Sequence, residues 1–281
     1  MSEPSPSFKR CSVKKKRPLE TLDAGCLEIF QDDLPLFREH GLTSAAALWH
    51  HASETAKNLR AERVTSRFDL RRADGTSQTF YIKRHSPSSL KEWIKPLLRG
   101  MWPQLGAMHE WEALWQFHEA GLPTMQPVAI FHHGRNSGLV TRSLDGCVKL
   151  SELARNRTLS ISDERRLLEL VAALTARMHG AGFHHQDYYL GHLMVPEVNR
   201  VATPYIIDLG RVRHCRPLAQ RWIVKDLAQL NYSAPHVTFL ARLRFLREYL
   251  GRPLGPGDKQ LIRAVTTKTA RIARHSRRHE L

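Results

Sequence analysis

The sequence predicts an α+β fold whose first half is rich in strands and whose second half is helical. Between residues 63 and 141, short apolar runs with β-branched and aromatic residues are separated by turn signals. From residue 160 onward, the apolar residues recur mainly at helical spacing. The length of 281 residues allows one large domain or two lobes with a substantial core.

In the first half, glycines and prolines mark where the elements end. Gly41 divides a region of short helices, Asp74-Gly75 is the turn of a hairpin, and Gly121 with Pro123 closes a helix. The linker after the last strand of this half is the expected hinge. The elements predicted here are short helices over 34–51, a hairpin over 63–83, a helix over 106–120, and strands over 128–131 and 138–141.

In the second half, the clearest helix begins at Ser160–Asp163 and runs to His179, with Gly180 as its stop. Its apolar residues recur every three or four positions and form a stripe toward the core. The elements predicted after it are short strands over 193–195 and 205–207 and helices over 226–230, over 239–250 and from Asp258.

The most informative pattern joins three motifs: His185-Gln186-Asp187, then His192, then Asp208 in Ile206-Ile207-Asp208-Leu209-Gly210. Kinase-type phosphotransferases need one aspartate that accepts a hydroxyl proton and two side chains that hold Mg²⁺ on the nucleotide phosphates. Their usual layout is H-R-D-x-x-x-x-N followed by D-F-G. Each motif alone is more often a surface turn or a strand end. Their joint occurrence in this order favours a phosphoryl-transfer site.

A lysine and a glutamate complete this candidate site. Lys83 in Tyr81-Ile82-Lys83-Arg84 fits the strand lysine that holds the nucleotide phosphates. Glu110, on the next predicted helix, can pair with that lysine and orient it. Glu112 lies about 200° away around the same helix, so only one of the two can face the sheet, and we choose Glu110.

The expected roles follow from this chemistry. Asp187 is the catalytic residue that accepts the proton, Lys83 and Glu110 bind ATP, and Asp208 binds Mg²⁺. His192 stands where most kinases have asparagine. Because Mg²⁺ prefers oxygen ligands, His192 either binds the metal through one nitrogen, acts through water, or hydrogen-bonds the loop.

These residues resemble the bacterial lipopolysaccharide kinases of the Kdo/WaaP type, close to the heptose(I) kinases of the inner core. The resemblance covers about residues 34–250, and His192 is one of its more specific marks. Its segments here are Phe80–Arg84, His109–Ala113, His118–Met125, Met178–Leu193, Ile207–Val212 and Arg221–Ala228.

The resemblance implies a two-lobed protein-kinase-like fold with a small β-rich N-lobe and a larger helical C-lobe. It also implies ATP- and Mg²⁺-dependent phosphorylation of a sugar hydroxyl on the lipid A–core glycolipid, at the cytoplasmic face of the inner membrane. Asp226 is expected to support the catalytic loop. We divide the chain into a disordered basic tail (1–20), a nucleotide-binding N-lobe (21–141), a C-lobe with the catalytic loop and metal site (142–254) and a basic C-terminal helix or tail (255–281).

Three departures from the kinase and family patterns stand out. Gln186 replaces the arginine that reads a phosphorylated activation loop, and only 17 residues lie between Asp208 and Asp226. The loop that should cover the nucleotide lies near Lys57–Arg67, which contains no glycine. Arg142-Ser143 occupies the hinge, where acidic residues are often found in the family. The alternatives are therefore a kinase for Kdo, another glycolipid or a protein, or a pseudokinase that acts as a binding module.

The net charge of +16 indicates anionic partners. No nucleic-acid-binding motif accompanies it, so we expect no nucleic acid and favour an anionic membrane surface. Contact is expected through Trp93–Trp102 or the C-terminal helix. With no secretory signal, no apolar stretch long enough to span a bilayer, and four scattered cysteines, a cytoplasmic protein at the inner membrane is predicted.

Overall fold

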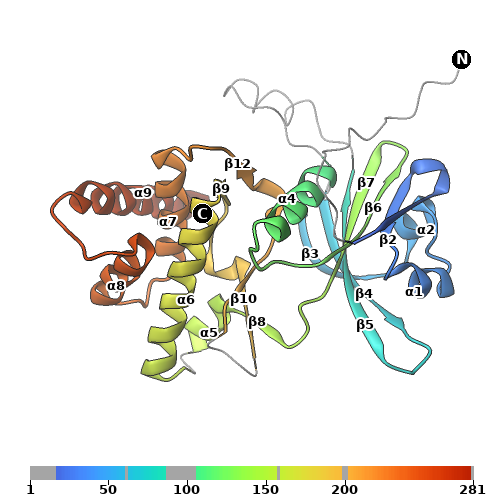
Figure 1. Ribbon diagram of the computed structural model, residues 1–281, viewed down its shortest axis with the longest axis horizontal. Helices are drawn as coiled ribbons and strands as arrows, with labels where there is room; N and C mark the ends of the chain where they lie inside the picture. Colours follow the sequence, from blue (N-terminus) through green and yellow to red (C-terminus); the bar gives the residue numbers. More distant parts are fainter. Residues whose placement is uncertain (1–16, 61–62, 87–105, 157–158, 198–201, 280–281) are drawn as a thin grey trace, which may run out of the picture.

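The computed structural model describes residues 17–60, 63–86, 106–156, 159–197 and 202–279. A part built around one large β-sheet lies beside a part made mainly of helices (Figure 1). The predicted α+β class, with strands first and helices second, is confirmed. The predicted contact segment Trp93–Trp102 lies outside the described residues.

The large sheet is antiparallel throughout and has the strand order β1-β2-β6-β7-β5-β4-β3. The hairpin expected over residues 63–83 is β4 and β5, so that prediction is confirmed. The strands of the large sheet are β1 (Leu19–Leu22), β2 (Leu27–Phe30), β3 (Glu54–Arg60), β4 (Arg63–Arg71), β5 (Ser77–His85), β6 (Pro127–His133) and β7 (Asn136–Arg142).

The first strand corrects the expected tail. We predicted disorder to residue 20, but Leu19 and Glu20 already pair with β2. Arg17 is fixed as well, because its guanidinium hydrogen-bonds Asp32 and Asp33. Asp33 is 1% exposed, and a buried carboxylate needs such a partner. Residues 17–20, which composition assigned to the tail, are therefore part of the folded structure.

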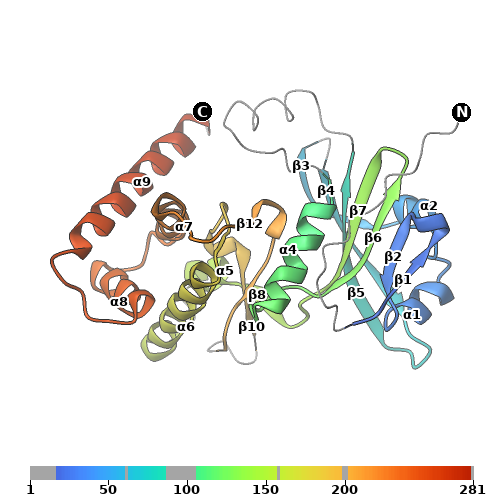
Figure 2. The ribbon, with the colours of Figure 1, turned by 45° about the horizontal axis from the view of Figure 1, so that its top comes forward.

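Each face of the sheet packs on helices. Helices α1 (Leu34–Glu39) and α2 (Ala45–His50) cover one face and bury Phe80 and Ile82 of β5 in an apolar cluster. Helix α4 (Met108–Glu119) lies on the other side, between the sheet and the helical part (Figure 2). Because side chains alternate along a strand, Lys83 points to the α4 face.

Gly138 is required by a close approach within the sheet. It pairs with Phe131 across β6 and β7, and a Cβ at residue 138 would lie 2.1 Å from a carbon of the buried Phe131 ring. No side chain fits there, so the glycine lets the ring lie flat over the neighbouring strand.

The helical part contains two small sheets and five helices among the described residues. Ser160 caps α6 by accepting a hydrogen bond from the Asp163 amide (3.1 Å), as its position predicted. The elements of the helical part are β8 (Cys147–Lys149), α5 (Leu150–Asn156), α6 (Ile161–Gly180), β9 (Phe183–His184), β10 (Leu193–Pro196), β11 (Tyr205–Ile206), β12 (Arg213–His214), α7 (Gln220–Ser233), α8 (Phe239–Leu250) and α9 (Asp258–His279).

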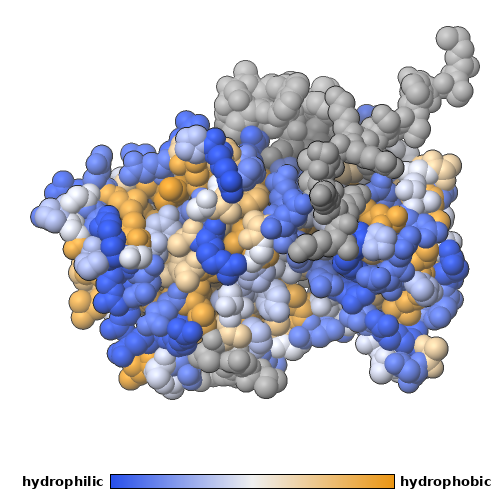
Figure 3. Space-filling view, in the orientation of Figure 1, coloured by the Kyte–Doolittle hydropathy of each residue, from blue (hydrophilic) through white to orange (hydrophobic). Residues whose placement is uncertain are grey.

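The surface is mostly polar. On the face drawn in Figure 3, hydrophilic residues predominate and the apolar ones form small scattered groups. Among the described residues, no helix combines the length and the apolar character that crossing a bilayer requires. Helix α9 packs on α7, and its exposed side carries Arg263, Arg271, Arg274 and Arg278.

Candidate active site

An ion-pair cluster joins the two parts of the molecule. The Lys83 ammonium donates to Oε1 of Glu110 on α4 (2.6 Å) and to Oδ1 of Asp208, which follows β11 (3.0 Å). Glu110 is 1% exposed, whereas Glu112 is exposed on the opposite side of the helix. The structure therefore brings Lys83, Glu110 and Asp208 together and separates Glu112 from them.

The charges in this cluster stabilise one another. The ammonium of Lys83 holds the pKa of Asp208 far below its ordinary value. Burial works against the charge of Lys83, but the carboxylates of Glu110 and Asp208 outweigh it, so the pKa of Lys83 is raised. Lys83 and Asp208 are therefore both charged at neutral pH, as phosphate and metal binding require.

Asp208 has a left-handed backbone, with φ 61° and ψ 61°. Such a conformation is uncommon outside glycine, although aspartate tolerates it better than most residues. Gln186 has a positive φ of 70° as well. Strained backbone of this kind tends to lie at functional sites, where the surrounding structure holds it. Here one of the two residues, Gln186, directly precedes Asp187, and the other, Asp208, is the predicted metal ligand.

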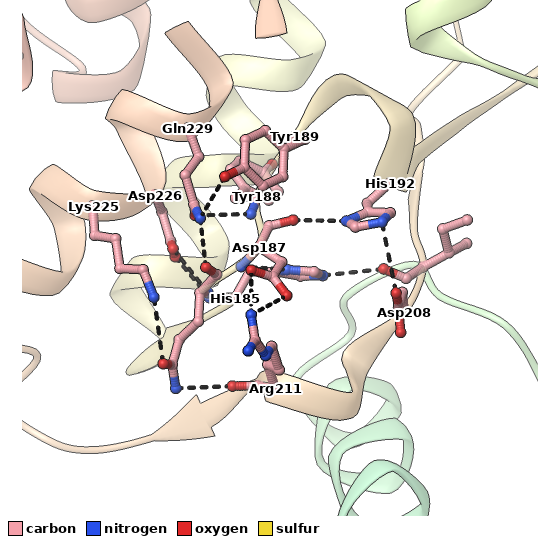
Figure 4. A network of polar contacts seen from close by, with 12 residues as sticks. His185, Asp187, Tyr188, Tyr189, His192, Asp208, Arg211, Lys225, Asp226 and Gln229 are labelled. Atoms are coloured by element: carbon pink, nitrogen blue, oxygen red, sulfur yellow. Dashed lines mark hydrogen bonds and ion pairs between the residues drawn. The ribbon is translucent and has the colours of Figure 1, made fainter. Parts of the chain in front are cut away.

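Asp187 lies on the loop between β9 and β10, with its carboxylate held by Arg211. Both carboxylate oxygens accept from Nη1 of Arg211, at 3.0 and 2.9 Å (Figure 4). The Arg211 side chain is 62% exposed and that of Asp187 is 27% exposed. The carboxylate of Asp187 is thus partly accessible from solvent, and its two oxygens share one nitrogen of Arg211.

Side chains of helix α7 hold the backbone of the loop that carries Asp187. The carboxylate of Asp226 accepts from the amides of His185 (2.7 Å) and Gln186 (2.9 Å). One turn on, Gln229 accepts from the Tyr188 amide (3.0 Å) and donates to the Gln186 carbonyl (2.6 Å). These contacts lie on the loop-facing side of α7 (Figure 4). The loop geometry is therefore fixed from outside the motif that carries the chemistry.

Asp226 is ionised although it is fully buried. Burial opposes its charge, but hydrogen bonds from His179 and from the His185 amide outweigh burial and lower its pKa. The structure gives Asp226 the supporting position that the family resemblance implied.

Two histidines of the loop have defined hydrogen-bond partners. Nε2 of His185 donates to the carbonyl of Ile207 (3.0 Å), and its Nδ1 accepts from the Asp187 amide (3.3 Å). Burial lowers the pKa of His185, in agreement with a neutral ring. Nδ1 of His192 donates to the carbonyl of Asp187 (2.7 Å), which leaves Nε2 facing Oδ2 of Asp208 at 3.6 Å.

The position of His192 bears on metal binding. Nε2 of His192 and Oδ2 of Asp208 face each other, so these two side chains would be the ones to hold a cation here. Within the described residues no group of three metal-ligating side chains occurs. Mg²⁺ in kinases takes only one or two protein ligands and completes its shell with phosphate oxygens and water, so this donor set fits it.

Sequence reasoning placed Lys83, Glu110, Asp187, His192 and Asp208 at one site, and the structure brings all five together. Their catalytic roles stay predictions.

Residues that support the loop were missed, namely Gln229 and Ser233, whose Oγ accepts from the Leu190 amide (2.9 Å). Asp226, Gln229 and Ser233 recur at helical spacing, and this polar stripe was the signal that could have revealed them.

Comparisons with known proteins agree with this geometry. The model of the lipopolysaccharide kinase (Kdo/WaaP) family matches residues 46–249. The chain belongs to the lipopolysaccharide kinase (Kdo/WaaP) family. The suspected resemblance is confirmed, and the chain is a kinase by family.

Individual relatives are similar over most of the chain. The lipopolysaccharide core heptose(I) kinase WaaP of Escherichia coli (strain K12) is 29% identical over 262 residues, which cover 84% of this chain and 97% of the relative. The protein of the same name from Pseudomonas aeruginosa is 34% identical over 197 residues, 65% of this chain and 74% of the relative. A solved structure described as WaaP in complex with acyl carrier protein matches with a TM-score of 0.66 and 26% identity, over 90% of this chain and 98% of that one.

Proposed function

We propose that this protein transfers the γ-phosphoryl group of ATP, with Mg²⁺, to a heptose hydroxyl of the lipopolysaccharide inner core. The observation that carries the proposal is the convergence of Lys83, Asp187 and Asp208, which come from distant parts of the sequence. The relatives named as heptose(I) kinases support the choice of acceptor.

In the proposed reaction Asp187 orients the acceptor hydroxyl and takes its proton. The hydroxyl oxygen forms a bond to the γ-phosphorus while the bond to the bridging oxygen breaks and ADP leaves. Lys83, oriented by Glu110, neutralises charge on the phosphates. Asp208 would hold Mg²⁺, and Nε2 of His192 lies beside its carboxylate. The ion would supply positive charge that neutralises and orients the phosphates.

We also propose that the protein works at the cytoplasmic face of the inner membrane, bound peripherally to anionic lipid. The net charge of +16 and the arginine-rich side of α9 support this location. Binding to anionic vesicles should weaken as salt rises, because exposed charges are screened. Salt-independent binding would contradict the electrostatic basis of this proposal.

The function is tested by transfer of labelled phosphate from ATP to purified core glycolipid. Wild type and Asp32→Ala, which changes a 59% exposed aspartate, should transfer phosphate equally. Asp187→Ala should lose at least about 100-fold in rate, because a positioned general base contributes about that much or more. Equal rates for wild type and Asp187→Ala would refute the catalytic assignment.

The choice of acceptor decides between the remaining candidates. A glycolipid that ends at Kdo and a generic protein substrate serve as comparison acceptors. Transfer only to heptose-containing glycolipid is the expected result, and transfer to the Kdo-terminated one would shift the assignment to Kdo. Nucleotide binding without transfer to any acceptor would indicate a pseudokinase, the alternative that the glycine-free hairpin favours.

A further inference from the structure

The hairpin of β3 and β4 raises a question about nucleotide binding. In protein kinases a glycine-rich loop in this position brings backbone amides close to the phosphates. Here residues 57–67 contain no glycine. Cβ atoms restrict how closely a backbone approaches a ligand, so another group must supply the missing contacts.

Arg63, the first residue of β4, has the position for this task. It pairs with His85 on β5, while Thr65 pairs with Lys83. Directly opposed residues of an antiparallel pair point to the same side of the sheet, and so do residues two positions apart. Arg63 therefore projects from the same face as Lys83, the face toward Glu110 and Asp208.

The guanidinium of Arg63 reaches across to the other lobe. Its Nη2 lies 3.0 Å from the point that a Cβ at Gly210 would occupy. Oε2 of Glu110 lies 3.3 Å from that same point, and Oδ1 of Asp208 lies 3.8 Å from it. Gly210 thus leaves room for an arginine from the first lobe beside both carboxylates of the lysine cluster.

Neither Arg63 nor Glu110 uses its full hydrogen-bonding capacity. Within the described ranges, no hydrogen bond or ion pair joins the Arg63 side chain to another residue. Oε2 of Glu110 is buried and has no hydrogen-bond partner there. His85, opposite Arg63, has its pKa lowered to about 3 by burial and by the charge of Arg63. Among the described residues, the Arg63 guanidinium therefore has unused donors, and it lies beside a cluster in which two carboxylates face one ammonium.

We propose that Arg63 binds the nucleotide phosphates beside Lys83 and takes the place of the missing glycine amides. A guanidinium presents a planar fork of donors that matches phosphate oxygens better than an ammonium does. This inference rests on the proposed function, since it concerns the same nucleotide. In this proposal a side chain of the hairpin, not its backbone amides, binds the phosphates. The absence of a side chain at Gly210 leaves the space that the Arg63 guanidinium needs.

The test is a titration of ATP, ADP and AMP against the full chain by calorimetry, without acceptor. Arg63→Ala should weaken ATP at least about tenfold, the scale of a lost charge-assisted contact, and AMP much less. Arg63→Lys should fall between, since it keeps the charge and loses the fork. The matched control is Arg67→Ala, on the same strand, with a 49% exposed side chain; it should bind ATP as wild type does.

A second variant covers the case in which Arg63→Ala does not fold. Gly210→Ala places a methyl group 3.0 Å from the guanidinium and should also weaken ATP more than AMP. Wild-type affinity for ATP in Arg63→Ala, or equal weakening of ATP and AMP, would overturn the inference. If wild type transfers phosphate, either of these two results leaves the proposed function intact. If wild type binds ATP through Arg63 but phosphorylates no glycolipid, only the proposed function is refuted.

Discussion

Asp226 offers the sharpest test of how the catalytic loop is built. It is 0% exposed, and its carboxylate accepts from two loop amides at 2.7 and 2.9 Å. Asp226→Ala leaves both amides buried without a partner. A hydrogen bond to a charged group contributes about 1.5–3 kcal/mol, and removing one partner of a buried charged set costs about 3–5 kcal/mol. We expect the free energy of unfolding to fall by about 3–5 kcal/mol.

Urea denaturation followed by circular dichroism measures this loss, with the slope of the transition as a check on the reference state. Asp226→Asn keeps one acceptor oxygen but turns a donor toward the second amide, so it should recover less than half of the loss. The control Asp69→Ala changes a 46% exposed side chain and should cost within about 0.5 kcal/mol. A loss below about 1 kcal/mol for Asp226→Ala would refute the view that this carboxylate holds the loop.

Four further perturbations have predictable results. Lys83→Met leaves the buried carboxylate of Glu110 without its partner and should destabilise the fold by about 3–5 kcal/mol, whereas Arg211→Ala, at a 62% exposed side chain, should cost at most about 1 kcal/mol in urea denaturation. Burial lowers the pKa of His85 to about 3 and of His184 to about 4. Below about pH 6.5 the unfolded chain therefore binds more protons than the folded one. As the pH is lowered from there, the free energy of unfolding should decrease by about 1.4 kcal/mol per pH unit for each ring, until the folded-state pKa of that ring is reached. Gly138→Ala should lower the melting temperature through a clash that costs about 3 kcal/mol.

Each of these expectations has a result that contradicts it. Equal costs for Lys83→Met and Arg211→Ala would mean that burial does not distinguish the two ion pairs. Stability that is flat between pH 6.5 and pH 5, the upper part of the predicted window, would show that the histidines are not held neutral in the fold. A melting temperature of Gly138→Ala equal to that of wild type would show that the neighbouring ring moves aside freely.

The gathering of Lys83, Glu110, Asp187 and Asp208 could be predicted because the chemistry fixes residue type and order. Strand and helix periods then decided which side chains face one another. The choice of Glu110 over Glu112 shows this, since about 200° of helix rotation separates their directions and only Glu110 contacts Lys83. Local patterns were sufficient wherever function or burial repeats at a fixed spacing.

Contacts between distant segments had no such signal. Arg63 approaches Gly210, and Arg211 binds Asp187, but neither approach leaves a trace in the spacing of residues. The first strand was missed for a different reason. Its neighbours are basic and polar, so composition favoured disorder, while the ion pairs of Arg17 with two aspartates fix the chain there.

Helix α7 has the catalytic loop on one side and α9 on the other. Thr269 of α9 donates to the Ala228 carbonyl and accepts from Asn231, both on α7. If lipid binds the arginine-rich side of α9, the packing of α9 on α7 determines which way Asp187 faces relative to the bilayer. Binding to lipid would then also orient the loop of Asp187 toward a membrane-anchored sugar, because attachment and orientation would be one event.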